Sequence, residues 1–251
     1  MRFGLLLNKE LKELWRSYRL VALAAVLVAM GILSPLAARF LPDLLGSLTP
    51  EGMVIQLPAP TVADANVQFV KNISQTGIIV LILVSMGVVA RERERGTAVL
   101  VLSKPVRRGE FLTAKLTALA LGLAASLLLS ALVSYVYTLL LLGDVSIAAY
   151  LAMAGLTFLY LLVVLALTFL ASAAFRSQLA AGGIGFFGMI LLSLLGSLPR
   201  VGRLLPGELL GWALRAGSGT GPSSWGALAV SLGIIAVCLL GAWATFRRVE
   251  L

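Results

Sequence analysis

The sequence predicts an all-α membrane protein, and three observations support the prediction. Of the 251 residues, 60% are hydrophobic and 12% are charged, against about 25% charged in an average soluble domain. Six apolar stretches without a charge are each long enough to cross a bilayer as a helix. The first follows a segment whose apolar residues recur at helical spacing. We therefore expect a single transmembrane domain over residues 1–251.

The six predicted spans differ in length and in what bounds them. Pro35 should kink or end the first, just before the charge of Arg39. The third and fourth are long enough to be tilted in the bilayer. Only three residues separate the fourth from the fifth, which is enough for a tight turn between antiparallel helices. The spans are predicted at 20–38, 73–90, 116–142, 147–175, 179–198 and 225–246.

The distribution of basic residues predicts the orientation. Of the 20 Lys and Arg residues, fifteen lie in segments on the side of the two termini and five lie on the other side. Because an excess of Lys and Arg marks the cytoplasmic side, both termini are expected in the cytoplasm. This asymmetry and contacts with lipid headgroups explain the net charge of +9. We therefore expect membrane lipid as a partner and no nucleic acid.

Residues 1–19 are predicted to form an amphipathic helix at the cytoplasmic interface, with Trp15 and Tyr18 at headgroup level. The segment either anchors and orients the first span or has a mechanical role, and helical spacing does not decide between the two. The apolar positions are Phe3, Leu7, Leu11, Leu14, Trp15 and Tyr18, and the polar positions are Lys9, Glu10, Lys12, Glu13 and Arg16.

The loop over residues 91–115 is the most informative segment. Arg and Glu alternate over 91–95, which extends the second span into water. Gly96 can end that helix, and Thr97 can cap a new short helix over 98–103. Pro105 would then end the short helix. Its apolar side chains need a surface to pack on, which is either lipid headgroups and the chain's own helices or a groove in a partner protein.

The same loop resembles the signature of ABC-2 family permeases. It is most similar to the short single-domain bacterial kind, such as sodium-efflux and copper-maturation permeases. The pair Arg108 and Gly109 departs from the family pattern, in which a bulkier polar pair is common. The motif is carried by Glu92, Glu94, Gly96, Thr97, Leu102 with Leu100 beside it, Ser103, Pro105, Val106, Arg107 and Lys115.

The resemblance implies that this loop is a cytoplasmic coupling helix seated in an ABC ATPase subunit. The chain would then be the permease of an ATP-driven exporter in the inner membrane of a bacterium or archaeon. A second permease chain, forming a homodimer, would complete the complex. The residues expected to contact the ATPase are Glu92, Glu94, Gly96, Thr97, Leu100, Leu102, Ser103, Pro105, Arg107 and Arg108.

The sequence itself has no nucleotide site. It contains no P-loop motif, so it is not expected to bind ATP in that manner. The resemblance implies that ATP and Mg are bound by the partner subunit, and this chain is expected to be no enzyme and to hold no cofactor. It also has no His and only one Cys, which removes the usual metal ligands.

Two other functions stay open. One is an ATP-independent carrier or channel, which should have a charge near the bilayer centre, and the predicted spans have none. The other is a force transmitter within an ABC complex that passes work to an extracytoplasmic protein. For transport, the resemblance places a pathway between the second and fifth spans, although simple packing is the competing interpretation of the same residues. The candidate lining residues are Ser85, Met86, Phe186, Phe187 and Met189.

Overall fold

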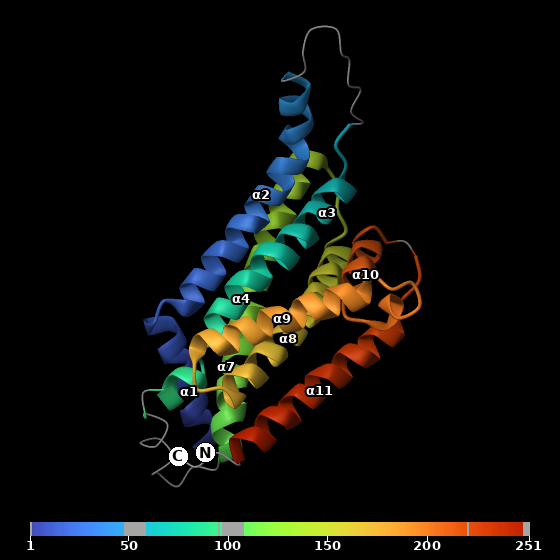
Figure 1. The fold of residues 1–251 in the computed structure, drawn as a ribbon. Helices are drawn as coiled ribbons and strands as arrows, with labels where there is room; N and C mark the ends of the chain where they lie inside the picture. Colours follow the sequence, from blue (N-terminus) through green and yellow to red (C-terminus); the bar gives the residue numbers. More distant parts are fainter. Residues whose placement is uncertain (1, 48–58, 95, 97–107, 220, 248–251) are drawn as a thin grey trace.

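A computed structural model describes residues 2–47, 59–94, 96, 108–219 and 221–247. Within these ranges every regular element is a helix and none is a strand. Six helical segments of the described chain are long and apolar enough to cross a membrane, which confirms the predicted fold class. In Figure 1, α1, the start of α7 and the end of α11 lie at one end of the bundle, which we call the terminal end. The end of α2, the start of α3 and α10 lie toward the opposite, distal end.

The observed helices follow the predicted order. The fourth, fifth and sixth spans match α8, α9 and α11 closely, whereas α7 begins eight residues before the predicted third span. The helix predicted over 98–103 lies outside the described residues. The elements are α1 Arg2–Arg16, α2 Arg19–Ser47, α3 Val62–Asn72, η1 Ile73–Gly77, α4 Ile78–Ser85, α5 Ala90–Glu94, α7 Arg108–Leu142, α8 Ile147–Ala174, α9 Gln178–Gly196, η2 Gly202–Leu204, α10 Glu208–Gly217 and α11 Trp225–Arg247.

Short polar signals set the helix boundaries. The side chains of Ser146 and Ser177 accept hydrogen bonds from backbone N–H groups in the first turns of α8 and α9, as N-cap residues do. Thr61 and Asp64 form a capping box at the start of α3. Gly143 follows α7 with a φ of 102°, a conformation that glycine adopts without strain. These signals place the turns between spans.

Of the two outcomes expected at Pro35, a kink or an end of the first span, the end does not occur. Helix α2 continues through Pro35 and on to Ser47. Beside the proline, Ser34 donates a hydrogen bond to the Met30 carbonyl at 2.6 Å, and Asn72 of α3 donates to the Ser34 hydroxyl at 3.0 Å. Neighbouring helices and Ser side chains of this kind allow membrane helices to tolerate proline.

The second span is longer than predicted and is interrupted twice. It runs from Val62 to Glu94, with a π-helical turn at η1 and a turn over 86–89 between α4 and α5. At the second interruption, the hydroxyl of Ser172 on α8 accepts hydrogen bonds from the backbone N–H groups of Val89 and Ala90, both at 3.1 Å. A side chain of a neighbouring helix therefore provides the hydrogen-bond acceptor for backbone N–H groups at this break.

The core is centred on α8, and α9 and α11 lie at the surface of the bundle. Helix α8 contributes the fully buried Tyr150, Met153 and Leu161 and contacts α7, α9, α10 and α11. By contrast, only 22% of the apolar stretches of α9 and of α11 is buried. These two helices present apolar surface outward, as expected where a membrane protein meets lipid.

Candidate functional site at the terminal end

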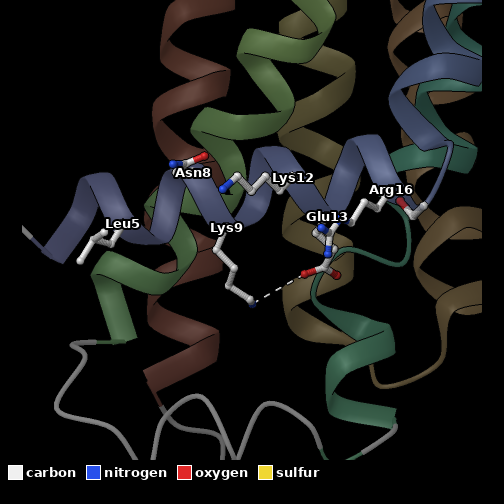
Figure 2. Close-up of a pocket in the computed structure, with 7 residues that line it drawn as sticks. Leu5, Asn8, Lys9, Lys12, Glu13 and Arg16 are labelled. Atoms are coloured by element: carbon white, nitrogen blue, oxygen red, sulfur yellow. Dashed lines mark ion pairs between the residues drawn. The ribbon is translucent and has the colours of Figure 1, made fainter.

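Helix α1 lies across the terminal end of the bundle (Figure 2). Its inner side packs through Leu7, Leu11 and Leu14 against the core. Trp15 is exposed, and so is Tyr18, which lies in the turn after α1. This arrangement confirms the amphipathic helix. On its outer side is a hollow of about 640 Å³, lined by Leu5, Asn8, Lys9, Lys12, Glu13, Arg16 and Ser17.

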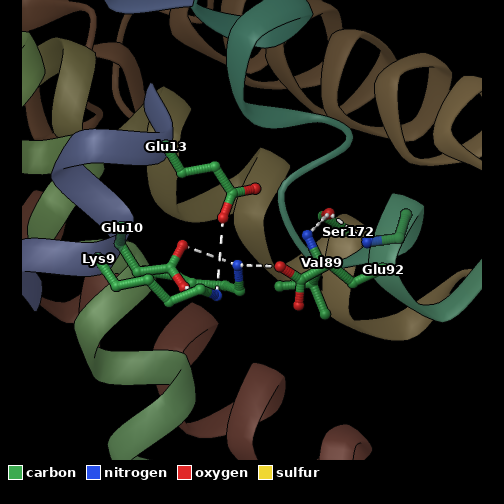
Figure 3. A network of polar contacts seen from close by, with 8 residues as sticks. Lys9, Glu10, Glu13, Val89, Glu92 and Ser172 are labelled. Atoms are coloured by element: carbon green, nitrogen blue, oxygen red, sulfur yellow. Dashed lines mark hydrogen bonds and ion pairs between the residues drawn. The ribbon is translucent and has the colours of Figure 1, made fainter. Parts of the chain in front are cut away.

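A buried ion cluster joins α1 to the two flanks of the 91–115 loop (Figure 3). The side chain of Lys115, on α7, is 1% exposed, and its Nζ lies 2.8 Å from Glu10 Oε2 and 2.6 Å from Glu92 Oε1. Glu10 comes from α1 and Glu92 from α5. A buried ammonium group is costly unless it is paired and hydrogen-bonded. Here one cation pairs with two carboxylates from two other helices.

Glu10 lies on the opposite face from the one predicted. The sequence placed it among the polar positions of α1, but the structure buries it. Position 10 follows Leu7 by three residues and precedes Leu14 by four, so it falls on the same helix face as these leucines. A carboxylate is tolerated on that face because Lys115 is there to pair with it.

A second layer of charges surrounds the cluster. Lys9 Nζ lies 3.2 Å from Glu10 Oε1 and 3.6 Å from Glu13 Oε2. Burial lowers the pKa of Lys9, but attraction to Glu10 and the hydrogen bond to it outweigh burial, so the pKa is raised overall. The Phe111 ring lies 5.0 Å from Lys115 Nζ and adds a cation–π contact. The raised pKa keeps Lys9 as a cation beside Glu10 and Glu13.

The carboxylates of the cluster also have the spacing of a cation site. Oxygen atoms of Glu10, Glu13 and Glu92 lie within 4.8 Å of one another. The ammonium of Lys115 already neutralises part of this charge at hydrogen-bond distance. The expectation that the chain binds no metal stays a prediction.

Two arginines tie the loop flanks to further helices. Arg93 Nη1 donates to the Ala173 carbonyl at 2.6 Å, near the end of α8. Arg108 Nη1 donates to the Arg247 carbonyl at 2.8 Å, at the end of α11. Basic side chains at helix C-termini bind the last carbonyls and suit the helix dipole. The flanks of the loop therefore contact α1, α8 and α11.

The residues expected to contact the ATPase fall into three groups: two bonded to other helices, two exposed, and six outside the described residues. Glu92 lies in the ion cluster, and Arg108 binds the end of α11. Glu94 is exposed at the end of α5, and Gly96 is exposed with a φ of 68°. The remaining six, Thr97, Leu100, Leu102, Ser103, Pro105 and Arg107, lie outside the described residues.

Of the five candidate pathway residues, Met189 lines the cavity near the distal end and the other four do not. Ser85 is buried and its hydroxyl donates to the Leu81 carbonyl within its own helix. Phe186 and Phe187 are exposed on α9, and Met189 is buried beside a cavity near the distal end. Their role in a pathway stays a prediction. The fifth residue, Met86, packs against Gly182 of α9.

Sequence reasoning missed Glu10, Lys9 and Arg93 as parts of the site. A signal for Glu10 was present, because it interrupts an apolar helix face. Lys115 was noticed only as part of a motif, although it is a lone charge beside an apolar run. No local signal paired the two, since 105 positions separate them.

Comparison with known proteins places the chain in a family. The model of a family described as protein of unknown function (DUF2705) matches residues 58–251. The uncharacterized transmembrane protein YxlG of Bacillus subtilis strain 168 is 28% identical over 251 residues, which is 98% of this chain and 97% of the relative. This similarity and the six apolar helices identify a membrane protein. The chain therefore belongs to the DUF2705 family of proteins of unknown function.

Proposed function

We propose that the chain is the membrane-spanning permease subunit of an ABC exporter, driven by a separate ATPase subunit that docks at the terminal end. The docking surface comprises the 91–115 loop and the outer side of α1. Its hollow is lined by three basic side chains and one acidic one, which suits an acidic partner surface. The similarity of the loop to ABC-2 permeases supports the same partner.

The observation that carries the proposal is the linkage of the loop flanks to the bundle. Glu92 and Lys115 lie on opposite sides of the loop and bind each other, and Lys115 also binds Glu10 of α1. Arg93 and Arg108 connect the same flanks to α8 and α11. A force on the loop would therefore reach α1, α5, α7, α8 and α11 together. Rigid-body movement of packed helices is a common form of such transitions.

The proposal is tested by affinity purification of the tagged chain from its native membrane. We expect a subunit with a P-loop in stoichiometric amount. Replacing both Leu100 and Leu102 by Asp should remove this subunit while the chain stays inserted, because charges replace the apolar side chains proposed to dock. The control replaces Leu198 and Leu204, exposed at the distal end, by Asp. Purification of the unchanged chain alone would refute the ABC assignment, and normal recovery with the Leu100 and Leu102 variant would refute the docking segment.

We also propose that the terminal end faces the cytoplasm, as the distribution of basic residues indicates. Ser17 and Ser223 are both exposed and lie toward the terminal and distal ends, while native Cys238 is buried. A cysteine at Ser223 should react with a membrane-impermeant maleimide in intact cells. A cysteine at Ser17 should react only after permeabilisation. The reverse pattern would overturn the orientation.

The two alternatives are an ATP-independent carrier or channel and a force transmitter within an ABC complex. A carrier or channel would transport without ATP, and the predicted spans lack the charge that such proteins usually place near the bilayer centre. A force transmitter would hydrolyse ATP in the complex without moving a substrate across the membrane. Transport and ATP hydrolysis by the purified complex in vesicles separate the three possibilities.

A further inference from the structure

A cavity of about 550 Å³ lies near the distal end between α8, α9 and α10, and we call it the distal cavity. Its volume is within the range of small-ligand sites. It is independent of the terminal-end site and of the function proposed above. Its lining consists of Tyr160, Met189, Leu192, Ser193, Gly196, Ser197, Leu198, Pro199, Gly202, Arg203, Pro206, Gly207, Glu208, Leu210 and Gly211.

One part of the wall is apolar and contains the hydroxyl group of Tyr160. Met189 and Leu192 of α9 and Leu210 of α10 supply apolar surface. Tyr160 of α8 is 9% exposed, and among the described residues its hydroxyl makes no hydrogen bond. The Tyr160 hydroxyl is therefore available to donate to a group inside the cavity.

The lining contains two charged residues, Glu208 and Arg203, and only Glu208 is in an ion pair among the described residues. Glu208 Oε1 lies 2.7 Å from Arg215 Nη2 and accepts a hydrogen bond from Ser224 Oγ at 2.9 Å. Its charge is thus balanced. Arg203 of η2 lines the cavity and is exposed, and it forms no ion pair with any residue in the described part. An anion near Arg203 would gain a charge-assisted hydrogen bond.

The cavity also adjoins surface suited to acyl chains. Its lining residue Ser193 is exposed on α9, and the next residue, Leu194, is 68% exposed. An exposed leucine beside the cavity opening suits contact with an acyl chain. An acyl chain can follow this surface toward Leu192 and Met189.

We propose that the distal cavity binds an anionic amphiphile, with a phosphate or carboxylate headgroup at Arg203 and an acyl chain along Met189 and Leu192. The Tyr160 hydroxyl donates to the headgroup or its ester oxygens. The class includes free acyl anions and anionic phospholipids, which share this chemistry. Arg203 supplies preference for charge, and the apolar wall supplies preference for a chain.

The test measures saturable binding of radiolabelled dodecyl phosphate to the full chain in phosphatidylcholine nanodiscs, with empty nanodiscs as background. We expect competition by unlabelled dodecyl phosphate and by phosphatidylglycerol. Inorganic phosphate and dodecylphosphocholine should compete poorly, because one lacks the chain and the other the net charge. Competition by phosphatidylglycerol but not decanoate identifies a phospholipid, and the converse identifies a free acyl anion.

Three variants test the residues. Arg203→Gln should weaken binding about tenfold, and Tyr160→Phe about threefold. Ser193→Phe should block the cavity. The matched controls are Arg200→Gln, a neighbouring exposed arginine outside the lining, and Leu191→Phe, an exposed position on the same helix outside the lining. The proposal is overturned if no saturable binding occurs, if inorganic phosphate competes fully, or if Arg203→Gln and Arg200→Gln bind alike.

Discussion

Replacing Lys115 by Met is expected to destabilise the folded chain by about 3–5 kcal/mol. The change leaves Glu10 and Glu92 buried near each other without the ammonium that lies within 2.8 Å of both. Removing one partner of a buried ion pair costs more than removing both, because the remaining charge is uncompensated. The free energy of unfolding in detergent micelles measures the effect.

The matched control is Lys12→Met, which removes an exposed lysine from α1 and should change stability by less than about 0.5 kcal/mol. A second comparison combines Lys115→Met with Glu10→Gln, which removes one of the two uncompensated charges. This double variant should recover part of the lost stability. Equal stability of the Lys115 and Lys12 variants would show that the cluster contributes no net stabilisation.

Replacing Gly31 by Ala should destabilise the chain by about 1–3 kcal/mol. A Cβ atom at position 31 of α2 would lie 2.6 Å from the backbone oxygen of Ser130 on α7. This oxygen belongs to the helix backbone and cannot move aside as a flexible side chain can. Small residues permit such close helix contacts in membranes.

Gly155→Ala provides the control for this prediction. Gly155 is on α8, and a Cβ atom there meets nothing within 4 Å. Alanine also has the higher helix propensity, by about 1 kcal/mol in water. Thermal unfolding should therefore rank Gly155→Ala at or above the unchanged chain and Gly31→Ala well below it. Similar melting temperatures for the two variants would contradict the close contact of α2 with α7.

The fold was predictable because membrane spans are local in sequence. A run of apolar residues without charge identifies a span wherever it packs, and the observed α8, α9 and α11 differ from the predicted limits by at most two residues. The sequence did not show that the helix continues past Pro35, because the polar contacts beside the proline join Asn72 and Ser34, which lie on different helices. A sequence pattern shows whether a segment prefers lipid or water. It does not show which neighbouring side chains compensate for a helix-breaking residue such as proline.

The site was predictable only in part, for the same reason. The loop motif pointed to Glu92 and Lys115, but their partner Glu10 is far away in sequence. The distal cavity was also missed. Tyr160 lies in an apolar run, and only the structure places it in the lining of the same cavity as Arg203, which precedes α10. Pairs of polar groups that are far apart in sequence can be identified only from the three-dimensional structure.

The two interruptions of the second span give it a mechanical character different from that of α7. Between Val62 and Glu94 the chain has joints at η1 and at residues 86–89. By contrast, α7 is one continuous helix of 35 residues, about 50 Å long. Glu92, near the end of the second span, and Lys115, near the start of α7, belong to the same ion cluster. A displacement at the terminal end would be absorbed by bending in the second span, whereas α7 would act as a lever and carry it along its full length.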